Sequence, residues 1–257
     1  MSDNLPLPHL PLGSSGLEIA PLSLGCVKLG RNAGVKYPNS FDLPSDAQAS
    51  ALLDTAESLG LNLLDTAPAY GSSEERLGTL LEQRTYPWRI CTKVGEVWDN
   101  QESHFDFSAQ GCRDSVARSM TRLQRNHLDM VLIHSSGEDL QALTCAHVLQ
   151  DMQRSGQIGA VGLSAKTGQG ALAALEAGLD LLMLTLNPAD QSLAEVIAHC
   201  AGQGMGILIK KPLSSGFGKT EDLTWVAQQS GVHSIVTGTL NPDHLRANAV
   251  AVSRGVT

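Results

Sequence analysis

Four residues whose side chains can exchange protons follow apolar stretches between positions 61 and 134 of the chain. Asp65 ends one short apolar run, and the phenol of Tyr70 follows it by five residues. Lys93 and His134 end the next two apolar runs. A polar side chain at the end of a buried segment is costly unless it has partners. We therefore predict that these four side chains meet at one proton-transfer site.

Such a set can hold a proton close to a carbonyl oxygen. An ammonium beside a phenol favours the phenolate, so we expect Lys93 to lower the pKa of Tyr70 from its usual value near 10. Asp65 would keep Lys93 charged, and His134 would orient the oxygen. The set contains no strong nucleophile, so it needs a partner reagent such as a nicotinamide hydride. An aldolase with Lys93 as a Schiff-base amine is an alternative, but it requires a depressed lysine pKa, which Asp65 opposes.

The elements that carry these residues alternate along the chain. Eight apolar runs are separated by segments with helical periodicity, which predicts a (β/α)8 barrel of parallel strands. The alternative is an open doubly wound sheet, which would more often show Gly-x-Gly-x-x-Gly after its first strand if it bound a dinucleotide, and that motif is absent. The expected strands are Leu22–Cys26, Leu61–Asp65, Arg89–Lys93, Leu128–His134, Ala160–Ser164, Leu181–Thr185, Gly206–Lys210 and Ser234–Thr237, and the helical segments are 45–59, 73–84, 108–126, 138–155, 168–177, 190–203, 219–230 and 241–253.

Three further segments complete the expected architecture. Two short extended pieces between Leu10 and Leu24 flank the turn Gly13–Gly16. The long loops Asn32–Ser45 and Glu96–Phe107 both follow strands, so both should overhang the barrel rim where active sites lie. We expect residues 1–257 to form a single domain.

Composition narrows the class of protein. The chain has 257 residues, of which 42% are hydrophobic and 17% charged, as expected for a globular protein with a large core. A net charge of −8 without a basic cluster argues against nucleic acid or membrane as a partner. Five scattered cysteines and an N-terminus without signal-peptide character predict a cytoplasmic protein with reduced thiols. The histidines lack metal-ligand spacing, so no metal is expected, and the oligomeric state is left open.

The segment Asp65-Thr-Ala-Pro-Ala-Tyr-Gly-Ser-Ser-Glu-Glu-Arg-Leu-Gly78 resembles the first signature of the aldo-keto reductase superfamily. Lys93 in Cys-Thr-Lys and His134 in Leu-Ile-His complete the tetrad in the family's order. The resemblance implies a TIM barrel whose bottom is plugged by an N-terminal β-hairpin. It also implies hydride transfer between NADP(H) and a small carbonyl or alcohol substrate, with Tyr70 as general acid/base.

The same resemblance implies a nucleotide site. Ser164 would contact the nicotinamide carboxamide, the loop after Lys210-Lys211 would line the pyrophosphate, and the start of the last helix would hold the adenosine portion. The lysine pair itself fits a solvated surface or a phosphate contact equally well. The implied cofactor-binding residues are Ser164, Asn187, Pro212, Leu213, Ser214, Gly216, Gly238, Thr239, Asn241 and Asn248.

Departures from the family pattern gather around the nicotinamide. The usual glutamine that grips the carboxamide aligns with Met183, and the stacking aromatic residue aligns with Leu186. Asn187 could supply a polar contact instead. No cation for a 2′-phosphate is evident, so NADP(H) follows from the family and NAD(H) stays open. A permissive pocket lined by Trp98 is expected, and a nucleotide-binding redox sensor with slow turnover is the alternative function.

Overall fold

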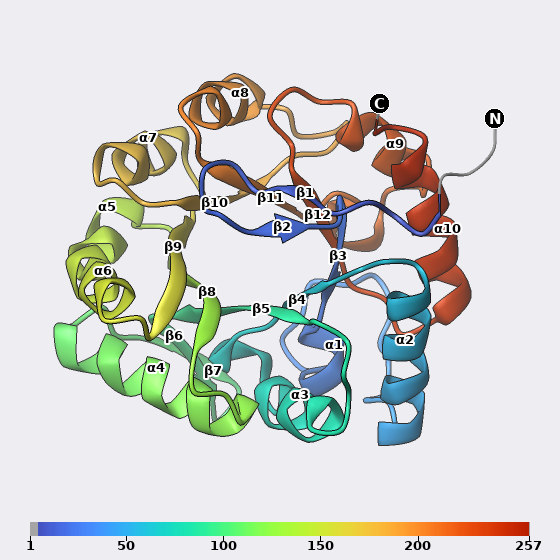
Figure 1. Ribbon diagram of the computed structural model, residues 1–257, viewed down its shortest axis with the longest axis horizontal. Coiled ribbons are helices and arrows are strands. Elements are labelled where there is room, and N and C mark those ends of the chain that lie inside the picture. The colour runs from blue at the N-terminus through green and yellow to red at the C-terminus, as the bar shows by residue number, and fades with distance from the viewer. Residues whose placement is uncertain (1–4, 257) are drawn as a thin grey trace.

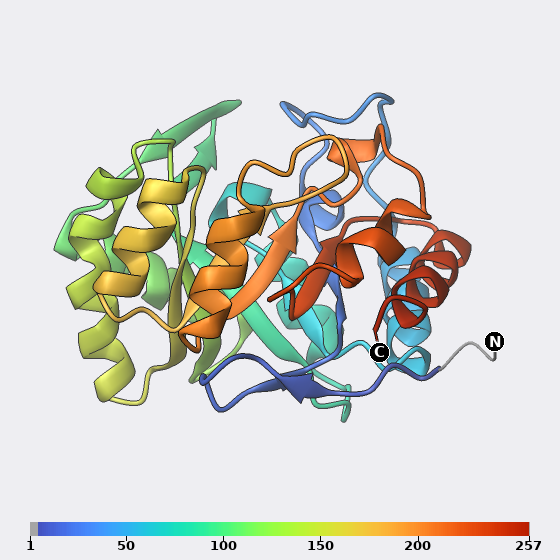
Figure 2. The same cartoon turned by 90° about the horizontal axis from the view of Figure 1, so that it is seen from above.

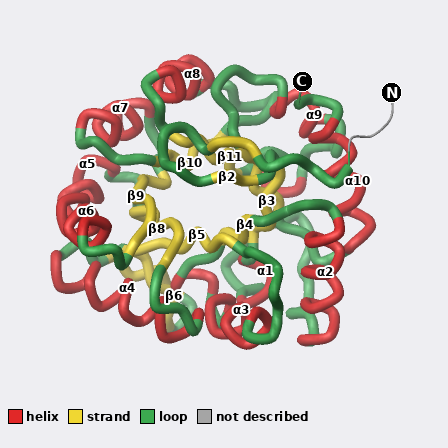
Figure 3. The backbone as a smooth tube through the Cα atoms, viewed as in Figure 1, coloured by secondary structure: helices red, strands yellow, loops and turns green. Residues whose placement is uncertain are grey.

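Eight parallel strands close into a barrel in the computed structural model, which describes residues 5–256. The strands follow one another around the barrel in chain order, β3-β4-β5-β8-β9-β10-β11-β12, and β12 pairs with β3. Figures 1 and 3 show the helices as a ring outside the strands. The predicted (β/α)8 barrel is confirmed, and the open-sheet alternative is wrong. The strands are β3 (Leu22–Gly25), β4 (Leu63–Asp65), β5 (Arg89–Val94), β8 (Leu128–His134), β9 (Ile158–Ser164), β10 (Leu181–Thr185), β11 (Gly206–Lys210) and β12 (Ser234–Thr237).

Several helices start at a residue whose side chain caps the first turn. Ser45 precedes α2 and accepts a hydrogen bond from the Gln48 amide, while the Gln48 side chain accepts one from the Ser45 amide. This reciprocal capping satisfies two amides that the helix cannot pair. The segment 138–155, expected as one helical stretch, is divided among three short helices. The helical elements are α1 (Val27–Gly30), α2 (Asp46–Ser58), η1 (Pro68–Tyr70), α3 (Ser73–Leu81), α4 (Ala109–Leu123), α5 (Asp139–Ala142), η2 (Leu143–Cys145), α6 (Ala146–Arg154), α7 (Gly168–Glu176), α8 (Ala194–Gly202), η3 (Ser214–Gly216), α9 (Asp222–Ala227) and α10 (Pro242–Ser253).

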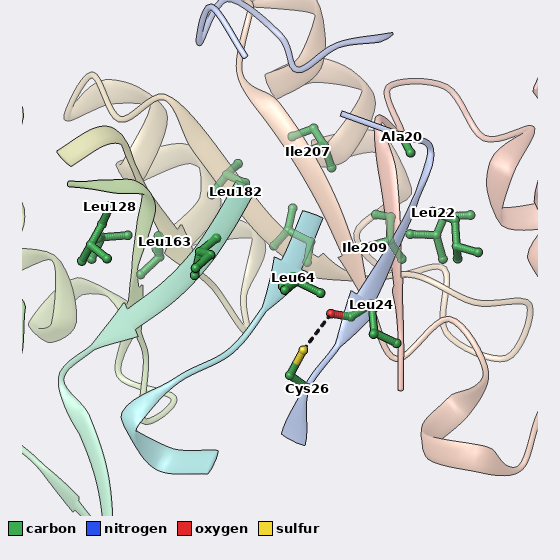
Figure 4. Close-up of a cluster of buried hydrophobic side chains, with 14 of the residues drawn as sticks. Ala20, Leu22, Leu24, Cys26, Leu64, Leu128, Leu163, Leu182, Ile207 and Ile209 are labelled. Atoms are coloured by element: carbon green, nitrogen blue, oxygen red, sulfur yellow. Dashed lines mark hydrogen bonds between the residues drawn. The ribbon is translucent and has the colours of Figure 1, made fainter. Parts of the chain in front are cut away.

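Two apolar cores hold the strands from both faces. Successive strand residues point to opposite faces, so Leu63 belongs to the core inside the barrel and Leu64 to the core under the helices. Figure 4 shows part of the second core, including Leu64 and Ile209. Burial on both faces explains why the strands are nearly continuous apolar runs.

The bottom of the barrel is closed by the antiparallel hairpin β1 (Leu10–Pro11) and β2 (Glu18–Ile19). The hairpin lies across the strands in Figure 1, and the buried side chains of Leu12 and Ile19 join the inner core. A Cβ at Gly206 would lie 2.6 Å from Leu12 Cγ, so a glycine there lets the plug approach the strand. The predicted N-terminal plug is confirmed.

Two long excursions stand at the opposite end of the barrel (Figure 2). The segment expected as a loop after β5 is a second hairpin, β6 (Glu96–Asp99) and β7 (Glu102–Phe105). Its turn residues Asn100 and Gln101 have φ of 47° and 66°, a conformation that usually requires glycine and that the sequence therefore did not signal. The other excursion connects α1 to α2. Along residues 5–256, no helix has both the length and the apolarity needed to cross a bilayer.

Candidate active site

The carboxyl ends of three neighbouring strands carry three of the four predicted catalytic residues to one rim. Asp65 is the last residue of β4, Lys93 lies one residue before the end of β5, and His134 ends β8. These strands pair in the order β4-β5-β8. The 3-10 turn η1, which begins with Pro68, brings Tyr70 back over the same rim.

The ammonium of Lys93 is fully committed to this cluster. Its Nζ donates to Asp65 Oδ1 at 2.5 Å, to the Thr66 carbonyl at 2.9 Å and to the Tyr70 hydroxyl at 3.2 Å. The Tyr70 hydroxyl also lies 3.5 Å from Asp65 Oδ2. Burial disfavours the charge on Lys93, but Asp65 and Tyr70 outweigh it and hold the lysine pKa above its usual value. Lys93 is therefore a charged donor and not a Schiff-base amine, which removes the support for the aldolase alternative.

The protonation of Tyr70 differs from the sequence-based expectation. Burial raises its pKa first, the Asp65 carboxylate raises it further, and the opposing effect of Lys93 is smaller. The net direction is upward, so the expected lowering was wrong. The sequence shows that a lysine is near the phenol, but it does not show how completely the phenol is removed from water. Tyr70 is thus held as a neutral phenol, the form that can donate a proton.

His134 has a partner that the sequence did not reveal. Its Nδ1 lies 2.8 Å from Oε2 of Glu96, the first residue of the β6–β7 hairpin. Burial lowers the pKa of His134 although Glu96 opposes this, so the imidazole is neutral at pH 7. Burial disfavours the Glu96 carboxylate, yet contacts with His134, Ser103 and Arg31 lower its pKa to about 2. Glu96 is therefore ionised and holds the ring, which meets Tyr70 edge-on with centroids 6.3 Å apart.

Asp65, Tyr70, Lys93 and His134 line a cavity of about 450 Å³ at the barrel mouth. Ser164 and Met183 form part of its wall, together with Lys166, Lys210 and Lys211. A larger hollow of about 640 Å³ lies beside the ends of α3 and α4 and contains none of the tetrad. Chemistry therefore belongs to the smaller cavity at the mouth.

A second cavity of about 390 Å³ adjoins the first and shares Val27, Tyr37, Lys211, Val236 and Gly238 with it. It lies between the loop after α1 and the loop after β11. Its charged lining residues are all cations, namely Lys28, Arg31, Lys36 and Lys211. A cleft with four cations and no carboxylate in its lining suits phosphate groups.

Six of the ten predicted cofactor residues lie at these two cavities or in the loop beside them. Ser164 lines the catalytic cavity, while Pro212, Leu213, Gly216 and Gly238 line the adjoining cleft, with Gly238 shared by both. Ser214 begins η3 in the same loop.

The remaining four residues serve local structure. Asn187 donates to the Lys211 carbonyl and accepts from the amides of Ala189 and Asp190, so it ties two rim loops together. Thr239 Oγ1 accepts from the Asn241 amide, Asn241 caps α10, and Asn248 is buried beside Thr237. Their contact with a nucleotide stays a prediction.

Two of the sequence-based expectations fall on residues around the mouth. Trp98 is not among the residues that line the catalytic cavity; it lies on β6 and stacks on Arg31, whose guanidinium carbon is 3.3 Å from the ring centroid. Leu186 is buried in the outer core and offers no surface to the cavity, while Met183 does line it. Substrate contact by Trp98 stays a prediction.

The sequence model of the Aldo/keto reductase family matches residues 21–224. The chain belongs to this family of oxidoreductases. Members interconvert carbonyls and alcohols with nicotinamide cofactors.

Solved structures agree with the family assignment. A crystal structure assigned to the aldo-keto reductases, from Pseudomonas aeruginosa, is 42% identical, covers 99% of this chain and 98% of its own, and superposes with a TM-score of 0.90. An aldo-keto reductase from Bacillus halodurans in its holo form, at 20% identity and a TM-score of 0.81 over 96% of this chain and 91% of its own, shares the fold.

Curated relatives are more distant. D-threo-aldose 1-dehydrogenase from a Pseudomonas species is 29% identical over 79% of this chain and 68% of its own length. NADH-specific methylglyoxal reductase from Escherichia coli is 25% identical over 95% of this chain and 75% of its own length. L-galactose dehydrogenase from Arabidopsis thaliana is 27% identical, and the match spans 65% of its length.

Proposed function

We propose that this aldo/keto reductase uses NADP(H) to interconvert a small aldehyde, ketone or sugar with its alcohol, with Tyr70 as general acid/base. The observation that carries the proposal is the contact between the Tyr70 hydroxyl and the Lys93 ammonium, 3.2 Å long, in the cavity at the barrel mouth. A bound nicotinamide nucleotide would supply the hydride.

The chain's own residues account for the proton. Tyr70 donates its hydroxyl proton to the carbonyl oxygen as negative charge develops there. Lys93 stabilises the resulting phenolate, and Asp65 keeps Lys93 charged and in place. His134, held by Glu96, orients the carbonyl oxygen. In the direction of alcohol oxidation the phenolate takes the proton back.

The cleft beside the catalytic cavity supports a nucleotide. Lys28, Lys36 and Lys211 would meet its phosphates, and Pro212, Leu213, Ser214 and Gly216 would follow the pyrophosphate. The choice of NADP(H) follows from the family, while one relative's name specifies NADH. A cytoplasmic location stays a prediction of the cysteine pattern.

A nucleotide-binding sensor with slow turnover is the second candidate. It is favoured by Met183, which places a thioether on the cavity wall where an amide grip is expected.

One set of titrations separates the candidates. NADPH and NADH fluorescence is followed on addition of protein, and absorbance is then followed with a panel of aldehydes and sugars. Binding followed by oxidation of the nucleotide supports the enzyme, whereas tight binding without turnover over the whole panel supports the sensor. A protein that binds neither nucleotide would contradict both the enzyme and the sensor proposals.

A further inference from the structure

Lys210 is an ammonium in the catalytic cavity that the proton-transfer scheme does not use. It is the last residue of β11, pairs in register with Thr185 of β10, and is partly buried. Its Nζ donates to Ser164 Oγ at 2.9 Å and to the Ala165 carbonyl at 2.8 Å. Ser164 ends β9 and Ala165 directly follows it, and β10 lies between β9 and β11. The Lys210 side chain therefore crosses over the carboxyl end of β10.

The charge of Lys210 is not neutralised by the protein. Among residues 5–256 its ammonium forms no ion pair, in contrast to Lys93 with Asp65. An ammonium has three donors, and its two protein acceptors, Ser164 and Ala165, leave one for a molecule in the cavity.

The charged groups around Lys210 are mostly other cations. Burial, followed by the positive charges of Lys211, Lys93 and Lys166, lowers its pKa to about 7, and Asp139 offsets this only in part. Asp139 itself is committed to the amides of Lys166 and Thr167. His134 is a further titratable group that interacts with this ammonium. A nearby electron-rich ligand would therefore stabilise the charged form.

The Lys210 ammonium lies beside the part of the cavity wall where the family's carboxamide-binding glutamine is replaced by Met183. Met183 brings no hydrogen-bonding group to the wall from β10, and Leu186 is buried in the core. Lys210 reaches over this strand from β11 and holds the hydroxyl of Ser164, the residue expected to meet the carboxamide.

We propose that Lys210, together with Ser164, binds the carboxamide oxygen of the nicotinamide and replaces the missing contact from β10. The inference rests on the proposed function, because it requires a nicotinamide nucleotide in this cavity. When it is protonated, Lys210 disfavours the positively charged oxidised nicotinamide relative to the neutral reduced one. Lys210 thus also biases the protein toward the reduced nucleotide.

The test is equilibrium binding of NADPH, NADP⁺, NADH and NAD⁺ without a carbonyl compound, measured by calorimetry on the full chain. Lys210→Met removes the donor and the charge, and Lys210→Gln keeps a donor but removes the charge. Lys219→Met is the matched control, because Lys219 is exposed and lines neither cavity. Thermal unfolding of each variant verifies that it is folded.

Lys210→Met is expected to weaken binding of the reduced nucleotide about ten- to a hundredfold, as for the loss of a charge-assisted hydrogen bond. Lys210→Gln should retain most of that affinity, and its preference for the reduced over the oxidised form should fall about tenfold. Lys219→Met should match the wild type.

Three results would overturn the inference. Unchanged nucleotide affinity in a folded Lys210→Met variant would refute it while leaving the proposed function intact. A variant that keeps all four affinities but discriminates less between a carboxylated aldehyde and its methyl ester would assign Lys210 to the substrate instead. A wild-type protein that binds no nucleotide would refute the proposed function and this inference with it.

Discussion

The buried ion pair between Asp65 and Lys93 permits a quantitative test of how the site is held together. Its N–O distance is 2.5 Å, and the two side chains are 5% and 1% exposed. Removing one partner of a buried pair costs about 3–5 kcal/mol, because the other charge is left without compensation. That is a large share of a typical unfolding free energy of about 5–15 kcal/mol. We therefore expect Asp65→Asn and Lys93→Met each to lower stability by about 3–5 kcal/mol.

The assay is guanidinium denaturation of the wild type, both single variants and the double variant. The double variant leaves no uncompensated charge, so its loss should be smaller than the sum of the single losses by about 2 kcal/mol or more. Asp46→Asn is the control, because its pair with Arg76 has a similar length of 2.7 Å but Asp46 is 75% exposed. The control should lose less than about 1 kcal/mol. Additive losses, or single losses as small as the control's, would refute this account of the cluster.

Three further outcomes follow from the structure. Stability should fall as pH rises above about 10. The pKa values of Tyr70 and Lys93 are higher in the folded protein than in the unfolded chain, so rising pH removes these protons from the unfolded chain first and favours unfolding. An unfolding free energy that stayed constant from about pH 8 to 11 would contradict this. Glu96→Gln removes the group that supports the protonated form of His134, so the limb of the activity profile that reports His134 should move to lower pH, and an unmoved profile would exclude this role. Leu12→Ala empties part of the barrel plug and should cost about 2–5 kcal/mol in chemical denaturation, while kcat/KM stays unchanged; a loss of activity at full stability would show that the plug communicates with the mouth.

The barrel could be predicted from the sequence because its strands are buried on both faces. That burial produces apolar runs whose polar last residues, such as Asp65 and His134, mark the rim. Contacts between side chains from different strands or loops have no corresponding pattern in the sequence. Glu96, two residues past the end of β5, meets His134 at the end of β8, and Lys210 meets Ser164 because its side chain crosses β10.

The pKa of Tyr70 is the other property of the site that could not be predicted from the sequence. The neighbours of Tyr70 were predicted correctly, but the direction of its pKa depends on burial and on which of two opposite charges has the larger effect. Those quantities exist only once the barrel has closed around the side chains.

The central claim is that Tyr70 supplies the proton during carbonyl reduction, and Tyr70→Phe tests it most directly. Single-turnover oxidation of bound NADPH or NADH by a carbonyl substrate is compared between the wild type and the variant, with nucleotide affinity measured in parallel. The account predicts a rate about 10²- to 10⁴-fold lower in the variant, at unchanged affinity for the nucleotide. A Tyr70→Phe protein that reduces the carbonyl at the wild-type rate would contradict it.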